Sequence, residues 1–172
     1  MREILIATPE EAIDIYRQHQ QVWEHAQRAA MPGVRPTFLF RAERGLIRVR
    51  SPDFARGTVR RFLPEAPAYL DLAAVIQSDD GRELSVPCDD LPAWAKRKLA
   101  AAGFDVLKLS VIDVACRVGD KLDRLTGRKH SIALPVASLK LHLAISDAAK
   151  AKAAWATGIG RGRRFGLGML TQ

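Results

Sequence analysis

The sequence predicts an α+β fold of two small units in tandem, each with an antiparallel sheet. The chain has 172 residues, of which 48% are hydrophobic, so it can form one ordinary core or two very small ones. Both halves mix short β-prone runs with helical patterns and show no strict alternation of strand and helix. This order favours antiparallel sheets over one doubly wound parallel sheet. The polar turn "SDDGRE" marks the division, which gives units at residues 1–80 and 81–172.

The first half begins with a strand and a capped helix. The apolar run "EILIA" predicts the strand. Residues 8–30 predict the helix, because Thr8 and Glu11 have the spacing of a capping box and Pro9 suits the first helical position. "TFLFRAERGLIRVRS" then predicts two strands joined by a turn at residues 43–45. The remaining elements of this half are a loop over residues 52–67 and a strand over residues 68–77.

The second half begins with a helix in "DDLPAWAKRKLAAAG", which Asp89 or Asp90 caps and Gly103 ends. The β-prone runs "FDVLKLSVIDVACRV" and "HSIALPVASLKLHLAI" predict a long hairpin with a polar, basic connection over residues 119–129. "SDAAKAKAAWATG" predicts a helix that Ser146 caps. "FGLGMLT" predicts the last strand.

The composition makes a polyanion the first partner to test. A net charge of +8 and a pI of about 10.0 favour nucleic acid or an acidic membrane, and the alternative is a basic protein without such a partner. Cys88 and Cys116 lie far apart with no histidine nearby, so we expect no zinc site and a reduced intracellular chain. No apolar run reaches membrane-span length, and the start lacks a signal-peptide pattern. We therefore expect a cytoplasmic protein with no membrane partner, no metal and no cofactor.

The stretch "GIGRGRRFGLGML" near the end of the chain combines five glycines with three arginines. A dinucleotide-binding pattern fails, because Arg163 and Phe165 stand where its third glycine is needed, and the sequence lacks the end of a P-loop. Glycines let backbone N–H groups approach an anion, and arginines add charge, so the loop predicts a phosphate site. A flexible tail is the alternative. The predicted binding residues are Gly158, Gly160, Arg161, Gly162, Arg163 and Arg164.

Three stretches together resemble one known family. On the predicted first helix, "IYRQHQQVWEHAQ" carries Tyr16, His19, Gln20 and Trp23, and "FLFRAER" follows it. "VPCDDLPAWAKRKLAAAG" lies in the middle of the chain and "TGIGRGRRFGLGML" at its end. With these motifs the chain resembles the CasE family, the type I-E CRISPR repeat-processing endoribonucleases of the RAMP superfamily.

The resemblance implies a fold, a reaction and partners. The family has two tandem ferredoxin-like, or RRM-like, units. It binds the stem-loop of CRISPR repeat RNA and cuts one phosphodiester at the 3′ base of the stem without a metal. The ribose 2′-oxygen attacks phosphorus, which leaves a 2′,3′-cyclic phosphate and a 5′-hydroxyl. The guide RNA then stays bound, and the protein becomes a subunit of the Cascade complex. The alternatives are a non-catalytic RNA-binding subunit of this complex and a basic protein-interaction module.

Two residues of the first helix are the predicted catalytic pair. Histidine can act as base or acid near neutral pH, since its reference pKa is about 6.5, and His19 matches the family's histidine. Tyr16 precedes it by three residues and projects from the same side of the helix, where its hydroxyl can position the 2′-oxygen or the scissile phosphate. The bland alternatives are a solvated helix histidine and a core tyrosine.

RNA contacts are expected at two further places. Arg128, Lys129 and His130 lie on the turn of the predicted hairpin, where they can grip phosphates or the groove of the stem, or form an ordinary solvated turn. The glycine-rich loop is expected to lie against the RNA backbone where the two halves meet.

Overall fold

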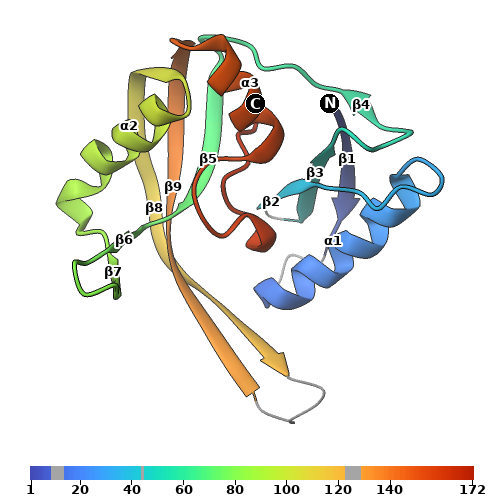
Figure 1. The fold of residues 1–172 in the computed structure, drawn as a ribbon, viewed down its shortest axis with the longest axis horizontal. Helices are drawn as coiled ribbons and strands as arrows, with labels where there is room; N and C mark the ends of the chain where they lie inside the picture. The colour runs from blue at the N-terminus through green and yellow to red at the C-terminus, as the bar shows by residue number, and fades with distance from the viewer. Residues whose placement is uncertain (9–13, 44, 123–128) are drawn as a thin grey trace.

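The computed structural model describes residues 1–8, 14–43, 45–122 and 129–172. The fold is α+β, as predicted, with two main antiparallel sheets side by side, the C-terminal loop between them and a small two-stranded sheet at the edge (Figure 1). Each main sheet forms the centre of one ferredoxin-like unit.

The first unit contains β1 (Arg2–Ala7), α1 (Ile15–Ala29), β2 (Leu39–Glu43), β3 (Leu46–Ser51) and β4 (Thr58–Val59). Its sheet has the antiparallel order β2-β3-β1-β4, which is the strand order of a ferredoxin-like unit. The stretch between β3 and β4 holds only bends and a bridge, so this unit has one helix where a full unit has two. The core forms between α1 and the sheet, around Val22, Phe40 and Val49.

The second unit contains β5 (Pro67–Ala73), α2 (Leu91–Ala101), β8 (Phe104–Leu122), β9 (Lys129–Ile145) and α3 (Ala148–Thr157). Its sheet has the order β5-β9-β8, and an antiparallel bridge from Thr171 to Tyr69 adds the chain end beside β5. The order is therefore again ferredoxin-like. Leu99 of α2, Trp155 of α3 and Leu141 of β9 belong to its one large core.

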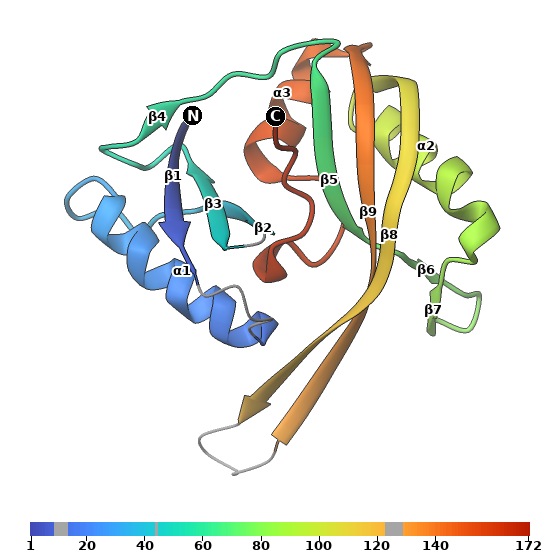
Figure 2. The same ribbon diagram turned by 180° about the vertical axis from the view of Figure 1, so that it is seen from behind.

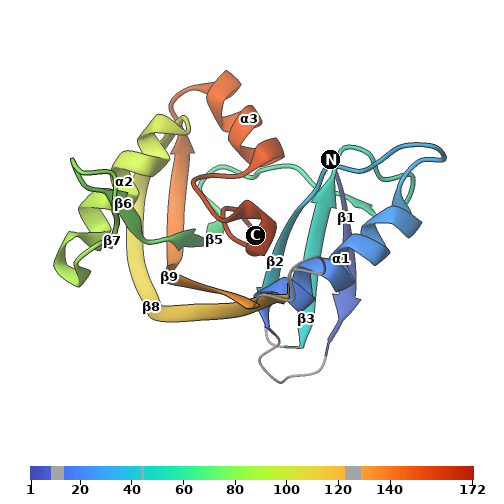
Figure 3. The same cartoon turned by 60° about the horizontal axis from the view of Figure 1, so that its bottom comes forward.

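A two-stranded arm extends from the second sheet. The pairing of β5 with β9 ends at Val136, whereas β8 and β9 continue to Leu122 and Lys129 (Figure 2). The predicted polar connection is thus partly strand. The arm runs toward the start of α1, where the backbone N–H of Asp120 donates to Asp14 Oδ2 at 2.6 Å (Figure 3). The arm of the second unit therefore reaches the helix of the first.

Two predicted helix starts were wrong. The N-cap of α1 is Asp14 and not Thr8, and its Oδ1 accepts from the backbone N–H of Tyr16 at 2.8 Å; Pro9 and Glu11 lie outside the described residues. The N-cap of α3 is Asp147, one residue after Ser146, and its carboxylate accepts from the N–H of Lys150. Both are carboxylate caps, which satisfy free N–H groups of the first turn.

The predicted end of α2 at Gly103 is confirmed. The predicted N-cap is confirmed in position and not in its hydrogen bond. Asp90 is the N-cap, but its side chain makes no capping hydrogen bond, because the short 3-10 helix η1 (Cys88–Asp90) leads directly into α2. Gly103 follows the C-cap with a φ of +87°, a left-handed conformation that favours glycine.

Two predicted strands differ from those observed. The strand predicted over residues 68–77 is two elements, β5 and β6 (Val75–Gln77), because β6 leaves the sheet to pair with β7 (Glu83–Ser85). The predicted last strand is instead the 3-10 turn η2 (Arg163–Phe165) followed by a single bridge, since Gly166 and Gly168 have positive φ and interrupt extended backbone.

The division predicted between residues 80 and 81 stays a prediction. The pairing of β5 with β9 nevertheless joins a strand from before that division to the second sheet. Sheet membership therefore changes between β4 and β5.

Candidate active site

His19 lies in the middle of α1, half-buried, with its imidazole against two aromatic rings of the first unit. The rings of His19 and Phe38 are stacked, with their centroids 6.0 Å apart, and the centroids of the His19 and Phe40 rings are 6.3 Å apart. The Nδ1 atom is buried and has no hydrogen-bond partner among the described residues. A cavity of 530 Å³ opens at this face of α1, lined by His19, Gln20, Trp23, Glu24 and Arg35.

Burial lowers the pKa of His19 below its ordinary value of 6.5, because the charged imidazolium loses hydration. A hydrogen bond that the imidazole donates to the backbone carbonyl oxygen of Arg164 raises the pKa in part, and the positive charge of the Arg164 guanidinium lowers it further. The imidazole is therefore neutral near pH 7 and able to accept a proton. The turn η2, which contains Arg164, packs against α1 and so brings this arginine from the far end of the chain beside His19.

The glycine-rich loop, which carries Arg164, packs closely against the first unit. Gly158, Gly160 and Gly162 have φ values of +82°, +77° and +74°, which favour glycine. A Cβ on Gly158 would lie 2.9 Å from Leu39, and one on Gly166 would lie 2.7 Å from Phe40. The glycines are thus explained by backbone conformation and close packing, and their predicted role in phosphate binding stays a prediction.

The three arginines of the loop are exposed but differ in their partners. Arg161 forms an ion pair with Glu83, and Arg163 donates to the carbonyl oxygen of Thr157 at 2.9 Å. Arg164 lies beside His19. The structure therefore brings one of the three predicted phosphate ligands together with the predicted catalytic histidine, whereas the other two have protein partners.

Tyr16 lies in the first turn of α1, half-buried, where the arm approaches the helix. A Cβ on Gly119 of β8 would lie 2.5 Å from Ile15 Cγ1 and 3.3 Å from the Tyr16 backbone nitrogen, so glycine permits this close approach of the arm to the helix. Tyr16 is not among the described residues that line the His19 cavity. The predicted pairing of Tyr16 with His19 at one reaction centre is therefore untested.

The predicted basic turn lies at the end of the arm. Arg128 is outside the described residues. Lys129 and His130 are both exposed at the start of β9, and Lys129 Nζ lies 2.7 Å from Asp120 Oδ2. Since Asp120 also bonds Asp14 at the start of α1, the basic end of the arm lies on the side of the molecule that carries Tyr16. Whether it contacts RNA is untested.

One ion pair, between Arg41 and Asp71, and one cation–π contact, between Arg50 and Trp155, cross the junction between the two units. Asp71 of β5 is 2% exposed and lies 2.7 Å from Arg117 of β8 and 3.4 Å from Arg41 of β2. Arg50 of β3 is 1% exposed, and its guanidinium lies 3.4 Å from the ring centroid of Trp155 in α3. Burial lowers the pKa of Arg50 to about 10. These contacts hold α1 and the loop in a defined relative position.

Sequence reasoning missed three kinds of residue at this site. Phe40 lies on β2 and Phe38 directly precedes that strand, and their rings contact each other, an apolar spacing of two that "FLFRAER" contains. Arg35 lies in a connection, with its guanidinium 5.2 Å from the Trp23 ring centroid, and nothing local in the sequence marks it. Asp71 reads as one polar residue in an apolar strand.

Three predicted absences concern metal, cysteine and membrane. Among the described residues, no three histidine, cysteine, aspartate or glutamate side chains gather as metal ligands would. Cys88 and Cys116 are exposed and unpaired with each other. None of the described helices has the length and apolar character needed to cross a membrane. The predictions of metal independence and of location stay untested.

Comparisons with known proteins agree with this architecture. A sequence profile described as "CRISPR associated protein" matches residues 73–171. No curated protein sequence matches the chain. Among solved structures, CRISPR endoribonuclease Cse3 bound to a 19-nucleotide RNA has a TM-score of 0.73 at 17% identity, over 98% of this chain and 97% of that one.

Two further structures are similar over nearly the whole chain. Thermus thermophilus Cse3, bound to an RNA representing a pre-cleavage complex, has a TM-score of 0.68 at 16% identity, covering 99% of this chain and 98% of that one. A chain of a CRISPR RNA-guided surveillance complex has a TM-score of 0.65 at 19% identity, again covering 99% and 98%. The profile spans more than half of the chain, and the matched folds are those that the CasE resemblance implied. The chain therefore belongs to the CRISPR associated protein family, with the fold of the Cse3 endoribonucleases.

Proposed function

We propose that this protein binds the stem-loop of a CRISPR repeat RNA and cleaves the precursor at the 3′ base of the stem. One observation carries the proposal: His19 lines an open cavity of the first unit, and Arg164, on the loop of the second unit, lies beside it where η2 packs against α1. A proton-transfer group and a cation from distant parts of the chain meet there. The similarity to structures described as Cse3 bound to RNA supports RNA as the substrate.

The reaction follows from the chemistry of that pair. The ribose 2′-oxygen attacks the adjacent phosphorus while His19, neutral because of its lowered pKa, accepts the 2′ proton. The bond from phosphorus to the 5′-oxygen breaks, and that oxygen takes up a proton. The products are a 2′,3′-cyclic phosphate and a 5′-hydroxyl, so the step needs neither a metal nor a hydrolytic water. The lowered pKa favours His19 as the base over His19 as the acid.

Charge on the reacting phosphate is offset by arginines around the cavity. Arg164 lies beside His19, and Arg35 lines the cavity with its guanidinium held over the Trp23 ring. Fixed cations aimed at a developing oxyanion stabilise the transition state without reorganisation. Tyr16 positions the nucleotide from the first turn of the helix.

The stem of the RNA lies along the basic end of the arm. Lys129 and His130 are exposed there, and Arg128 adjoins them in the sequence. Such contacts to phosphate fix position and register without reading sequence. The cut RNA stays bound, and the protein serves as a subunit of Cascade together with its other subunits. The similarity to a chain of a CRISPR RNA-guided surveillance complex supports this assembly.

Cleavage of an end-labelled repeat stem-loop tests the proposal. Wild-type protein should cut once at the 3′ base of the stem, and mass spectrometry should find a cyclic phosphate on the upstream product. His19→Ala should abolish cutting and keep RNA affinity within several-fold. His25→Ala is the matched control, since His25 lies six residues along the same helix and is not among the residues that line the cavity.

The other outcomes identify the alternatives. Wild-type protein that binds the stem-loop without cutting it is a non-catalytic RNA-binding subunit. Protein that neither binds nor cuts is a basic protein-interaction module. Equal cutting by His19→Ala and wild type would refute the assigned base.

A further inference from the structure

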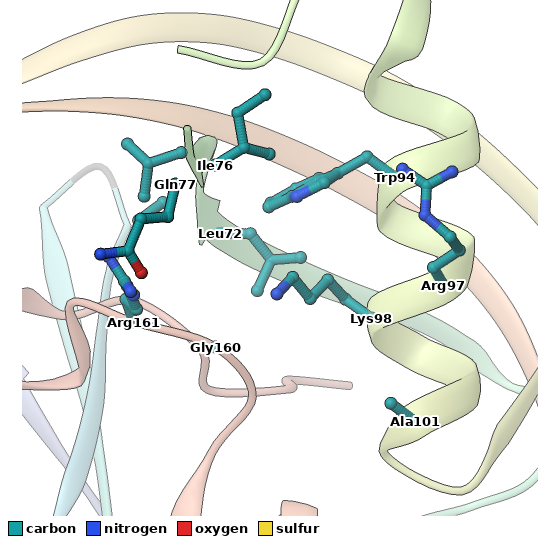
Figure 4. Close-up of a pocket in the computed structure, with 11 residues that line it drawn as sticks. Leu72, Ile76, Gln77, Trp94, Arg97, Lys98, Ala101, Gly160 and Arg161 are labelled. Carbon is teal, nitrogen blue, oxygen red and sulfur yellow. The ribbon is translucent and has the colours of Figure 1, made fainter. Parts of the chain in front are cut away.

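A second cavity lies on the other side of the glycine-rich loop from His19. It has a volume of 540 Å³ and lies between α2, the end of β5, β6 and the loop at Gly160 (Figure 4). This size falls in the range of pockets that hold small molecules. None of the residues that line this pocket lines the His19 cavity or belongs to the arm.

The walls of this pocket combine an apolar floor with a basic rim. Leu72, Val75 and Ile76 provide the apolar surface. Arg97 and Lys98 of α2 and Arg161 of the loop provide the positive charge, and no carboxylate is among the described lining residues. Arg161 also pairs with Glu83 at the edge, so its charge is partly neutralised. An apolar surface beside cations suits a nucleobase with its phosphate.

A buried donor points to a polar ligand in the same pocket. Trp94 is 4% exposed and projects from α2 into the pocket between Ile76 and Leu72 (Figure 4). Its Nε1–H is buried and has no hydrogen-bond partner among the described residues. A buried donor left unpaired is costly, so an acceptor is expected at this position. Lys98 extends across the pocket toward Gly160, which brings an ammonium group to the same space.

The glycine-rich loop connects the surroundings of this pocket to those of His19. An adjacent cavity of 490 Å³ is lined by Arg164 and Phe165 of the loop, and it shares Ala73, Gly160 and Arg161 with the Trp94 pocket. Arg164 in turn lies beside His19. A strand of RNA with its scissile phosphate at His19 can therefore follow the loop into the Trp94 pocket.

We propose that the Trp94 pocket binds a single-stranded nucleotide of the repeat RNA, next to the cleaved bond and outside the stem. The phosphate accepts hydrogen bonds from Trp94 Nε1 and Lys98, and the base lies on the apolar floor near Leu72. This inference rests on the proposed function, because it assumes that RNA is cut at His19. It adds a subsite that binds single-stranded RNA next to the stem.

The test compares RNAs that differ only outside the stem. The stem-loop alone and stem-loops extended by several nucleotides on the 5′ or the 3′ side carry a 2′-deoxy sugar at the cut site, which removes the attacking hydroxyl. One extension should tighten binding to wild-type protein by about tenfold, as one hydrogen bond to a charged group does. Lys98→Gln should lose this gain and keep its affinity for the unextended stem-loop.

Lys96→Gln is the matched control, since Lys96 is exposed on the same helix and is not among the lining residues. It should retain the full gain. The indole N–H signal of Trp94, assigned by its loss in Trp94→Phe, should shift on adding the extended RNA and not the stem-loop. The indole signal of Trp155, which packs against Arg50, should stay in place with both RNAs.

Each other result overturns the inference. If wild type binds all three RNAs with equal affinity, the inference is wrong, even when the stem-loop is cut as proposed. If Lys96→Gln and Lys98→Gln lose equal affinity, the gain comes from the general positive charge of α2 and not from the pocket. A Trp94 shift with polyglutamate and not with extended RNA makes the pocket a protein-docking site. Failure of wild type to bind any of the RNAs refutes the proposed function itself.

Discussion

Replacing Asp71 with asparagine tests how much the buried carboxylate stabilises the fold through Arg117 of its own unit and Arg41 of the other unit. The carboxylate is 2% exposed and lies between Arg117 at 2.7 Å and Arg41 at 3.4 Å. Removing one partner of a fully buried ion pair costs about 3–5 kcal/mol. Here the arginine side chains are 24% and 12% exposed, and asparagine keeps one acceptor oxygen. The expected loss of unfolding free energy is therefore about 2–3 kcal/mol.

Urea unfolding followed by circular dichroism measures this loss. For a chain of this size each kcal/mol lowers Tm by about 2–4 °C, so Asp71→Asn should melt about 4–12 °C below wild type. Asp113→Asn is the control, because Asp113 is exposed on β8. RNA cleavage should also fall, since His19 and Arg164 belong to different units. A loss below about 0.5 kcal/mol, the size of an ordinary surface effect, would refute the reasoning.

Four further predictions concern the reaction and the loop. The lowered pKa of His19 means that its neutral, proton-accepting form persists as pH falls, so the rate of single-turnover cleavage should decline only below pH 6.5. Chelation by EDTA should leave that rate unchanged. Arg164→Ala should reduce the slope of log affinity against log salt by about 0.7–0.9, whereas Arg163→Ala, whose guanidinium already bonds Thr157, should change it less in filter-binding titrations. Gly166→Ala should lower Tm, because a Cβ would lie 2.7 Å from Phe40 at a φ of +78°.

Most of the regular elements could be predicted from the sequence because their signals are local. The alternation of apolar residues in "FLFRAERGLIRVRS" predicted β2, β3 and their turn, and both β8 and β9 lie within the predicted hairpin. The α+β class followed from the order of these elements.

The errors occur where tertiary contacts decide between equal local choices. Serine and aspartate are both good N-caps, and in the structure it is the carboxylate of Asp147, not the hydroxyl of Ser146, that accepts from the backbone N–H of Lys150. The division between residues 80 and 81 stays a prediction, and the pairing of β5 with β9 of the second sheet is a tertiary contact of the same kind. Strand partners far along the chain leave no local mark, and this is also why Arg164 beside His19 was not foreseen.

The glycines and the arginines of the loop require different experiments. Five glycines from Gly158 to Gly168 have positive φ, and Gly158 and Gly166 pack against Leu39 and Phe40 of the other unit. A substitution at any of them changes the junction, so lost cleavage in such a variant is expected whether or not the loop contacts RNA. Charge variants reduce this problem, because the Arg164 side chain is exposed and its replacement leaves the glycines in place. Only a salt slope that falls in Arg164→Ala, at unchanged Tm, assigns phosphate binding to the loop.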